Sequence, residues 1–248
     1  MTSGNLNGNI AIITGSSRGI GRAIARRLAR DGTAVVINWR ENREKAREAA
    51  AEINAAGGRA IDIQGDVSVV ADVRRLFEEA GNQLGPPDIL VNNAGIARYR
   101  PIREVPEDEF DQVFAVNVKG TFFACQEAGR RMRSGGRIIN ISSTVTRMLL
   151  SNYGVYAATK GAVEQLTRVL ARELGDRGIT VNAVSPGPVD TELFRAGKTA
   201  EQIDRMANMA AMGRLGEVDD IADVVAFLAG EGGRWISGQV IPVNGGMA

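Results

Sequence analysis

Short apolar runs alternate with longer amphipathic segments along the 248-residue chain. Seven runs rich in β-branched residues lie at residues 10–13, 34–37, 60–63, 89–91, 137–141, 179–181 and 239–241. Several are apolar on both faces, which is typical of strands in a parallel sheet that helices cover on each side. Apolar residues recur at three- and four-residue spacing in the segments between them, as in helices, at residues 21–30, 43–56, 69–83 and 161–175. The alternation predicts an α/β fold, a doubly wound (Rossmann-type) parallel sheet of about seven strands with helices on both faces.

A further helix is predicted to begin at Pro106, where Glu107 and Asp108 would face the positive end of the helix dipole. It should continue through Asn117 toward Arg131. No linker, long charge run or internal repeat divides the chain. Residues 1–248 are therefore predicted to form a single domain that carries both the cofactor and the substrate site.

The least regular stretch of the chain, residues 185–216, follows a predicted strand and contains prolines and glycines. Within it, residues 190–215 are predicted to cover the substrate. Phe194, Met206, Met209 and Met212 would give this segment an apolar inner surface, although the packing of a helix would explain the methionines equally well.

The charge and the rare residue types exclude several classes of function. The net charge of +1 gives no reason to expect a nucleic acid or an acidic membrane as partner. Without histidine and with a single cysteine, Cys125, the chain cannot form a Ser-His-Asp or Cys-His system, a disulfide or a zinc site of these ligands, and no metal site is predicted. The first eight residues lack the pattern of a signal peptide, and no apolar run could span a bilayer. We expect a cytoplasmic protein.

A glycine-rich turn follows the first predicted strand and leads directly into a helix. Gly15, Gly19 and Gly21 would let the backbone turn tightly and approach a pyrophosphate closely. The N-terminus of the helix would offer unpaired N–H groups to that phosphate. The position of the turn between a strand and a helix favours a dinucleotide site.

The Gly-x-x-x-Gly-x-Gly spacing of this turn is one of several features that resemble the short-chain dehydrogenase/reductase family over nearly the whole chain. Asn92-Asn93-Ala94-Gly95 resembles the family's N-N-A-G segment, Asp66-Val67 its adenine-contacting pair, and Pro186-Gly187-Pro188-Val189 its loop on the nicotinamide side. The resemblance implies these residues as cofactor-binding: Gly15, Ser17, Arg18, Gly19, Ile20, Gly21, Asn38, Trp39, Arg40, Asp66, Val67, Asn93, Ala94, Gly95, Tyr156, Lys160, Pro186, Gly187, Val189 and Thr191.

The end of the second predicted strand indicates which dinucleotide is bound. Trp39 stands where NAD-specific members of the family carry Asp, the residue that binds the ribose 2′-hydroxyl. Arg40 follows it, and Arg18 lies in the glycine-rich turn; two guanidinium groups there would suit a 2′-phosphate. We therefore predict NADP(H) in preference to NAD(H). The alternative is that both arginines are solvated surface residues.

Tyr156 and Lys160 are four residues apart at the start of a helical pattern, so their side chains should project from one face. With Ser143, just after the strand at residues 137–141, and Asn117, they resemble the catalytic tetrad of the family. Hydride transfer to a ketone requires a proton for the oxygen, and a nearby lysine ammonium should lower the pKa of a tyrosine toward neutrality. Tyr156 would then act as general acid and base, and Ser143 would stabilise the substrate oxygen. The resemblance implies that Lys160 holds the nicotinamide ribose and that Asn117 holds a water.

The resemblance is greatest to 3-oxoacyl-(acyl-carrier-protein) reductases and related ketoreductases, so reduction of a 3-oxoacyl thioester or related ketone is expected. Members that engage acyl carrier protein present arginines at the pocket mouth. Arg177 matches one such position, whereas Ser134 stands at the other, beside Arg130, Arg131 and Arg133. Acyl carrier protein is thus a doubtful partner.

Two other hypotheses stay open. The chain could reduce or oxidise a small free alcohol, sugar, steroid or xenobiotic ketone. It could also be a non-catalytic protein that senses a dinucleotide. The closing segment at residues 235–243 resembles one that packs between subunits, which implies a homotetramer or a dimer.

Overall fold

The seven predicted strands form one sheet in which every neighbouring pair is parallel, in the order β3-β2-β1-β4-β5-β6-β7. The computed structural model describes residues 6–248; residues 1–5, in the segment for which no signal peptide is expected, lie outside the described residues. The strands are β1 (Ile10–Ile13), β2 (Ala34–Trp39), β3 (Arg59–Gln64), β4 (Ile89–Asn92), β5 (Arg137–Ile141), β6 (Thr180–Pro186) and β7 (Val240–Val243). The predicted doubly wound α/β fold is confirmed.

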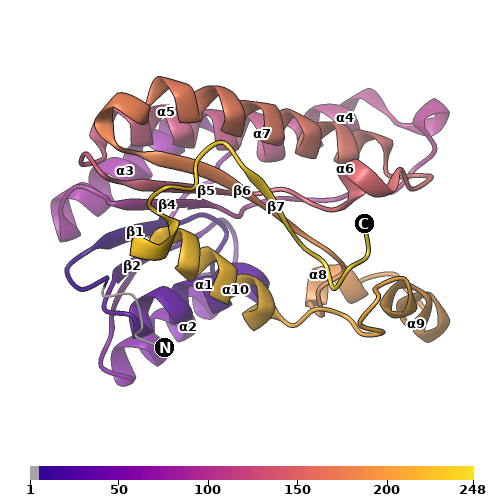
Figure 1. Ribbon diagram of the computed structural model, residues 1–248, viewed down its shortest axis with the longest axis horizontal. Helices are drawn as coiled ribbons and strands as arrows, with labels where there is room; N and C mark the ends of the chain where they lie inside the picture. The colour runs from indigo at the N-terminus through magenta and orange to yellow at the C-terminus, as the bar shows by residue number, and fades with distance from the viewer. Residues whose placement is uncertain (1–5) are drawn as a thin grey trace.

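Helices cover the sheet on both faces (Figure 1). One face packs against α1 (Gly19–Arg30), α2 (Arg43–Ala55) and α10 (Val218–Ala229), and the other against α3 (Val70–Leu84), α5 (Thr121–Arg131) and α7 (Gly154–Glu173). Each layer has its own apolar core: Leu28 and Val225 lie in the first, and Phe77 and Leu170 in the second. Strands 10–13 and 89–92 are buried along their whole length, which explains why their sequences are apolar on both faces.

The helix predicted from Pro106 toward Arg131 is interrupted. It consists of α4 (Glu107–Phe114), a π-helical turn (Ala115–Gly120) and α5. Asn117 lies inside the π-helical turn. Such turns inside helices are frequent at functional sites, and the sequence pattern gave no sign of this one.

The order of the strands reverses between β1 and β4, the point at which an open α/β sheet forms a ligand crevice. The glycine-rich turn follows β1, the Asn93 segment follows β4, and Ser143 follows β5. Because parallel strands end at the same edge of a sheet, these three segments meet there.

The segment at residues 190–215 contains two helices, α8 (Glu192–Arg195) and α9 (Ala200–Asn208), that lie beyond one end of the sheet (Figure 1). Phe194 and Met206 are partly buried, whereas Met209 and Met212 are exposed. A short helix, α6 (Val145–Met148), precedes α7, and 3₁₀ turns lie at Ile102–Glu104, Gly175–Arg177 and Glu231–Gly233. None of the helices within residues 6–248 is long and apolar enough to cross a membrane.

Candidate active site

The glycine-rich turn packs against the segment that follows β4 too closely for side chains. Gly15 has φ of 62°, and a Cβ there would lie 2.9 Å from Cα of Ala94. A Cβ on Gly21 would lie 2.5 Å from Nδ2 of Asn93, which itself donates to the carbonyl of Gly15 at 3.0 Å. The glycines at these two positions are therefore required by contact between the two loops, and this contact shapes the floor of a cleft.

The N-terminus of α1 opens into this cleft. Arg18 precedes the helix and its side chain forms no cap, and the first turn contains no acidic residue. Gly19, Ile20 and Gly21 line the cleft, whose volume is about 910 Å³. A volume of this size lies within the range of cofactor sites, and an uncapped helix N-terminus suits a phosphate. The turn therefore fits the pyrophosphate of a dinucleotide.

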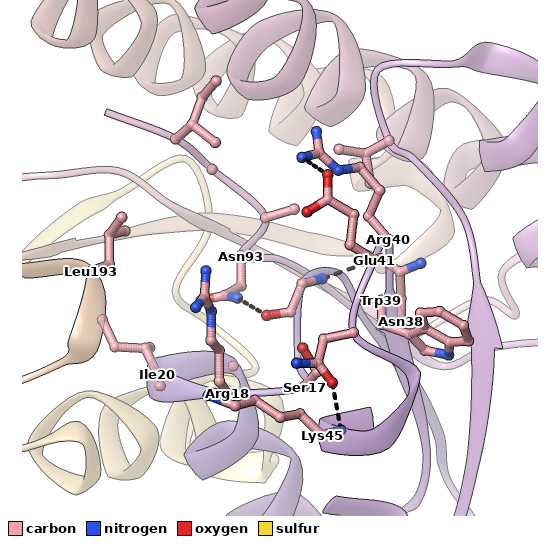
Figure 2. A pocket seen from close by; sticks show the side chains of 18 of the residues that line it. Ser17, Arg18, Ile20, Asn38, Trp39, Arg40, Glu41, Lys45, Asn93 and Leu193 are labelled. Atoms are coloured by element: carbon pink, nitrogen blue, oxygen red, sulfur yellow. Dashed lines mark hydrogen bonds and ion pairs between the residues drawn. The ribbon is translucent and has the colours of Figure 1, made fainter. Parts of the chain in front are cut away.

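Charged side chains from several elements surround the outer end of the cleft. Arg18 and Lys45 both pair with Glu192, at 3.2 and 2.9 Å, whereas Arg40 pairs with Glu41 and approaches Asp66 at 3.8 Å. Figure 2 shows these basic groups around the pocket. Arg18 and Arg40 are both exposed, as solvated surface arginines would be. Both also line the same cleft, which a site for a 2′-phosphate requires.

Trp39 and Asn38 have structural partners at this end of the cleft. The indole of Trp39 points away from Arg18 in Figure 2, and its Nε1 donates to Asp62 at 3.0 Å. The Asn38 side chain accepts from the backbone N–H of Gly15 at 3.1 Å and donates to the carbonyl of Gly65 at 3.1 Å. Asn38 thus ties the glycine-rich turn to β2, and the cleft has no carboxylate at position 39.

Tyr156 and Lys160 lie in the first two turns of α7 and project to one side of it, as predicted. The Ser143 side chain lies close enough to the Tyr156 hydroxyl to lower its pKa. Nζ of Lys160 lies 5.6 Å from the centre of the Tyr156 ring and donates to the carbonyl of Ile141, at the end of β5, at 2.7 Å. Three residues from two segments therefore converge at the carboxyl end of β5.

The pKa values in this cluster depart from the expectation that Lys160 makes Tyr156 acidic. Burial raises the pKa of Tyr156 to about 12, while the neighbouring Ser143 side chain acts in the opposite direction. Burial also lowers the pKa of Lys160 to about 8. Desolvation opposes both charged forms, and in the protein alone it outweighs the attraction between ammonium and phenolate.

Asn117 is buried and its side-chain amide is fully engaged. The amide accepts from the N–H of Ile96 and donates to its carbonyl, both at 2.9 Å, and also donates to Thr159 at 3.0 Å. It joins the loop after β4 to α7 beside Lys160. Gly95 lies between the two, because a Cβ there would be 3.4 Å from Oδ1 of Asn117 and 3.6 Å from Nζ of Lys160. The expected water beside Asn117 stays a prediction.

Most residues predicted to bind cofactor line the one cleft. Its lining includes Gly15, Ser17, Arg18, Gly19, Ile20, Gly21, Asn38, Trp39, Arg40, Asp66, Val67, Asn93, Ala94, Gly95, Tyr156, Lys160 and Thr191. The structure does not place Ser143, Asn117, Pro186, Gly187 or Val189 in that lining. Pro186 ends β6, Gly187 packs against Asn244, and Val189 is buried beside Gly216.

The sequence analysis missed Lys45, Glu192 and Glu164. Lys45 and Glu192 line the cleft and contact each other across it. Glu164 lies one turn beyond Lys160 and accepts from the hydroxyls of Ser142 and Thr146, at 2.8 and 2.9 Å. It therefore holds the loop that carries Ser143 against α7. The i, i+4 spacing from Lys160 to Glu164 was the one signal in the sequence that could have identified it.

Comparison with known proteins gives consistent matches along the whole chain. A family model described as Enoyl-(Acyl carrier protein) reductase matches residues 15–248. The NADPH-dependent aldehyde reductase-like protein, chloroplastic, of Arabidopsis thaliana is 46% identical over 97% of this chain and 94% of its own. The short-chain dehydrogenase/reductase of Serratia marcescens BCRC 10948 has a TM-score of 0.95 at 40% identity, covering 98% of this chain and 99% of its own. Angucycline C-6 ketoreductase LanV with bound NADP has a TM-score of 0.93 at 41% identity, covering 98% and 97%.

Proposed function

Since the chain belongs to the short-chain dehydrogenase/reductase family, we propose that it is an NADP(H)-dependent oxidoreductase that interconverts a ketone and a secondary alcohol. The observation that carries this proposal is that Tyr156 and Lys160 line the same cleft as the glycine-rich turn. A dinucleotide whose pyrophosphate lies on α1 would extend along that cleft toward the Tyr156 hydroxyl.

In this proposal Tyr156 donates its proton to the oxygen of the ketone and recovers it in the reverse reaction. Its high pKa keeps the hydroxyl protonated at neutral pH, which suits the reduction. The hydride is the chemistry that the nicotinamide supplies when bound. Ser143, whose side chain lies beside the Tyr156 hydroxyl, would donate to the same ketone oxygen and stabilise its developing charge.

Lys160 would act through position and charge. Its ammonium is fixed by the carbonyl of Ile141, and its other two N–H groups are free to bind hydroxyls of the nicotinamide ribose. Near neutral pH Lys160 is charged in most molecules, because its pKa is about 8. A charged Lys160 favours the phenolate of Tyr156 once the proton has been transferred.

The preference for NADP(H) rests on the outer end of the cleft. Arg18, Arg40 and Lys45 line it, and no carboxylate stands at position 39 to bind a 2′-hydroxyl. The relative from Arabidopsis thaliana is named as NADPH-dependent, and the LanV structure holds NADP. A 2′-phosphate would compete with Glu192 and Glu41 for these cations.

A free ketone is the better substrate candidate, because the guanidinium of Arg177 is already engaged within the protein. Its guanidinium donates to the carbonyls of Gly129 and Met132, at the C-terminal end of α5. Arg130 and Arg131 pair with the buried Glu127, and Arg133 pairs with Asp88. These contacts argue against a basic surface ready to receive an acidic carrier protein. The cytoplasmic location stays a prediction.

Turnover assays with paired cofactors and substrates test the proposal. We expect a reactive diketone and a panel of free ketones to be reduced with NADPH, with kcat/KM at least about tenfold higher than with NADH. A 3-oxoacyl thioester of a carrier protein should be a poorer substrate than the best free ketone. Equal kcat/KM for the two cofactors would refute the assigned phosphate site, and no consumption of either cofactor would refute the enzymatic function.

A further inference from the structure

Aromatic side chains gather beside the Tyr156 hydroxyl. The rings of Tyr99 and Tyr153 are 4.5 Å apart between centres and tilted by 46°. Tyr156 helps to raise the pKa of Tyr99, and Tyr153 helps to raise the pKa of Tyr156, so the three hydroxyl groups lie near one another. Tyr99 comes from the loop after β4 and Tyr153 from the residue before α7, so the two rings form a wall next to the proposed proton donor.

Lys198, from the segment at residues 190–215, completes this cluster. Its Nζ lies 5.0 Å from the centre of the Tyr99 ring and 4.8 Å from that of Phe194, and it donates to the carbonyl of Phe194 at 2.6 Å. The side chain is partly buried. We call Tyr99, Tyr153, Phe194 and Lys198 the aromatic-lysine cluster.

The charge of Lys198 is not balanced by an acid. Within the described part of the chain, no carboxylate lies within 4.0 Å of its Nζ. Arg195, three residues earlier in the same segment, is by contrast paired with Asp190. Burial lowers the pKa of Lys198 because the ammonium loses water. Ring faces and one carbonyl are weak compensation for that loss, so an anion would be attracted to this position.

We propose that the aromatic-lysine cluster is a subsite for an aryl ketone that carries an anionic substituent, a carboxylate or a phenolate. This inference rests on the proposed function. The aryl ring would pack against Tyr99 and Tyr153, which are next to Tyr156, so that the ketone reaches the proton donor. The anionic group would pair with the Lys198 ammonium, which in the protein alone contacts ring faces and one carbonyl. Lys198 is then a specificity-determining residue.

A pair of substrates that differ only in charge isolates this effect. We would measure kcat/KM with NADPH for 4-acetylbenzoate and for its neutral methyl ester. The wild-type protein should prefer the carboxylate, and Lys198→Met should lower the ratio of carboxylate to ester by about tenfold, as the loss of a charge-assisted contact implies. The change should lie in KM for the carboxylate. Lys198→Arg, which keeps the charge, should retain most of the preference.

Arg205→Met is the matched control. It removes a positive charge from an exposed side chain on α9, in the same segment, and should leave the carboxylate-to-ester ratio within about twofold of wild type if the effect is local. A reactive diketone serves as a reporter of the basic chemistry in every variant.

The outcomes separate the two proposals. A wild-type ratio near one, or an equal loss on both substrates in Lys198→Met, overturns the anionic subsite. Reduction of the diketone without reduction of either aryl ketone also overturns it, while the proposed function stands. Failure to reduce the diketone in the wild-type protein contradicts the proposed function itself.

Discussion

Lys160 is an ammonium group inside the protein, with 4% of its area exposed. Its folded pKa of about 8 lies below the ordinary lysine pKa of 10.5. The unfolded chain therefore binds more protons than the folded chain between these two values, and stability gains from a rise in pH across that window. Below pH about 8 the cost of the buried charge is fully present.

This cost predicts a pH-dependent difference between the wild-type protein and Lys160→Met. Between pH 7 and pH 10.5, the free energy of unfolding of the wild type should rise relative to that of the variant by up to about 3 kcal/mol. Urea denaturation of both proteins at several pH values measures the difference. Other groups that titrate in this range cancel in the comparison. Parallel pH dependence of the two proteins would contradict the buried charge.

At the scale of single elements, α1 contains a glycine, Gly21, that tertiary contacts require although glycine has a low helix propensity. Gly21 lies in the first turn of α1, where a Cβ would meet Asn93 in the loop after β4 and the carbonyl of Gly15. Gly81 lies inside α3, where a Cβ would meet nothing within 4 Å. Close contacts therefore require glycine at position 21, whereas position 81 has room for a side chain.

Gly21→Ala should destabilise the protein and weaken NADPH binding, because its Cβ would lie 2.7 Å from a backbone oxygen. Overpacking of this kind costs about 1–3 kcal/mol. Gly81→Ala should stabilise the protein by about 0.5–1 kcal/mol, since alanine loses less backbone entropy in a helix. Thermal unfolding and cofactor titration of both variants test this. Tolerance of alanine at position 21 with unchanged NADPH affinity would show that the contact is not needed.

Prediction from sequence succeeded where information is local. Strand and helix alternation specified the sheet, and the i, i+4 spacing placed Tyr156 and Lys160 on one face of α7. It failed where distant segments meet: the carbonyl of Ile141 that holds Lys160, the carbonyls that engage Arg177 and the burial that raises the pKa of Tyr156 are all tertiary contacts. The π-helical turn at Asn117 was missed because its sequence is compatible with an ordinary helix.

At the scale of the whole molecule, β7 is an edge strand and the preceding Trp235 is 95% exposed. Phe122 on α5 and Val169 on α7 are also about half exposed. Apolar side chains on these elements fit the proposed association of subunits. Light scattering should give a mass of two or four times 26.4 kDa, and a mass of one chain at micromolar concentration would refute it.

The most direct test of the proposed chemistry is Tyr156→Phe, which removes one hydroxyl from the cleft. NADPH binding, measured by fluorescence titration, should stay close to that of the wild type, while kcat for ketone reduction should fall by about 10²–10⁴-fold, the contribution of general acid catalysis. Tyr153→Phe, on the neighbouring ring, should cause a much smaller loss. If Tyr156→Phe binds NADPH and still reduces the ketone at close to the wild-type rate, Tyr156 is not the proton donor.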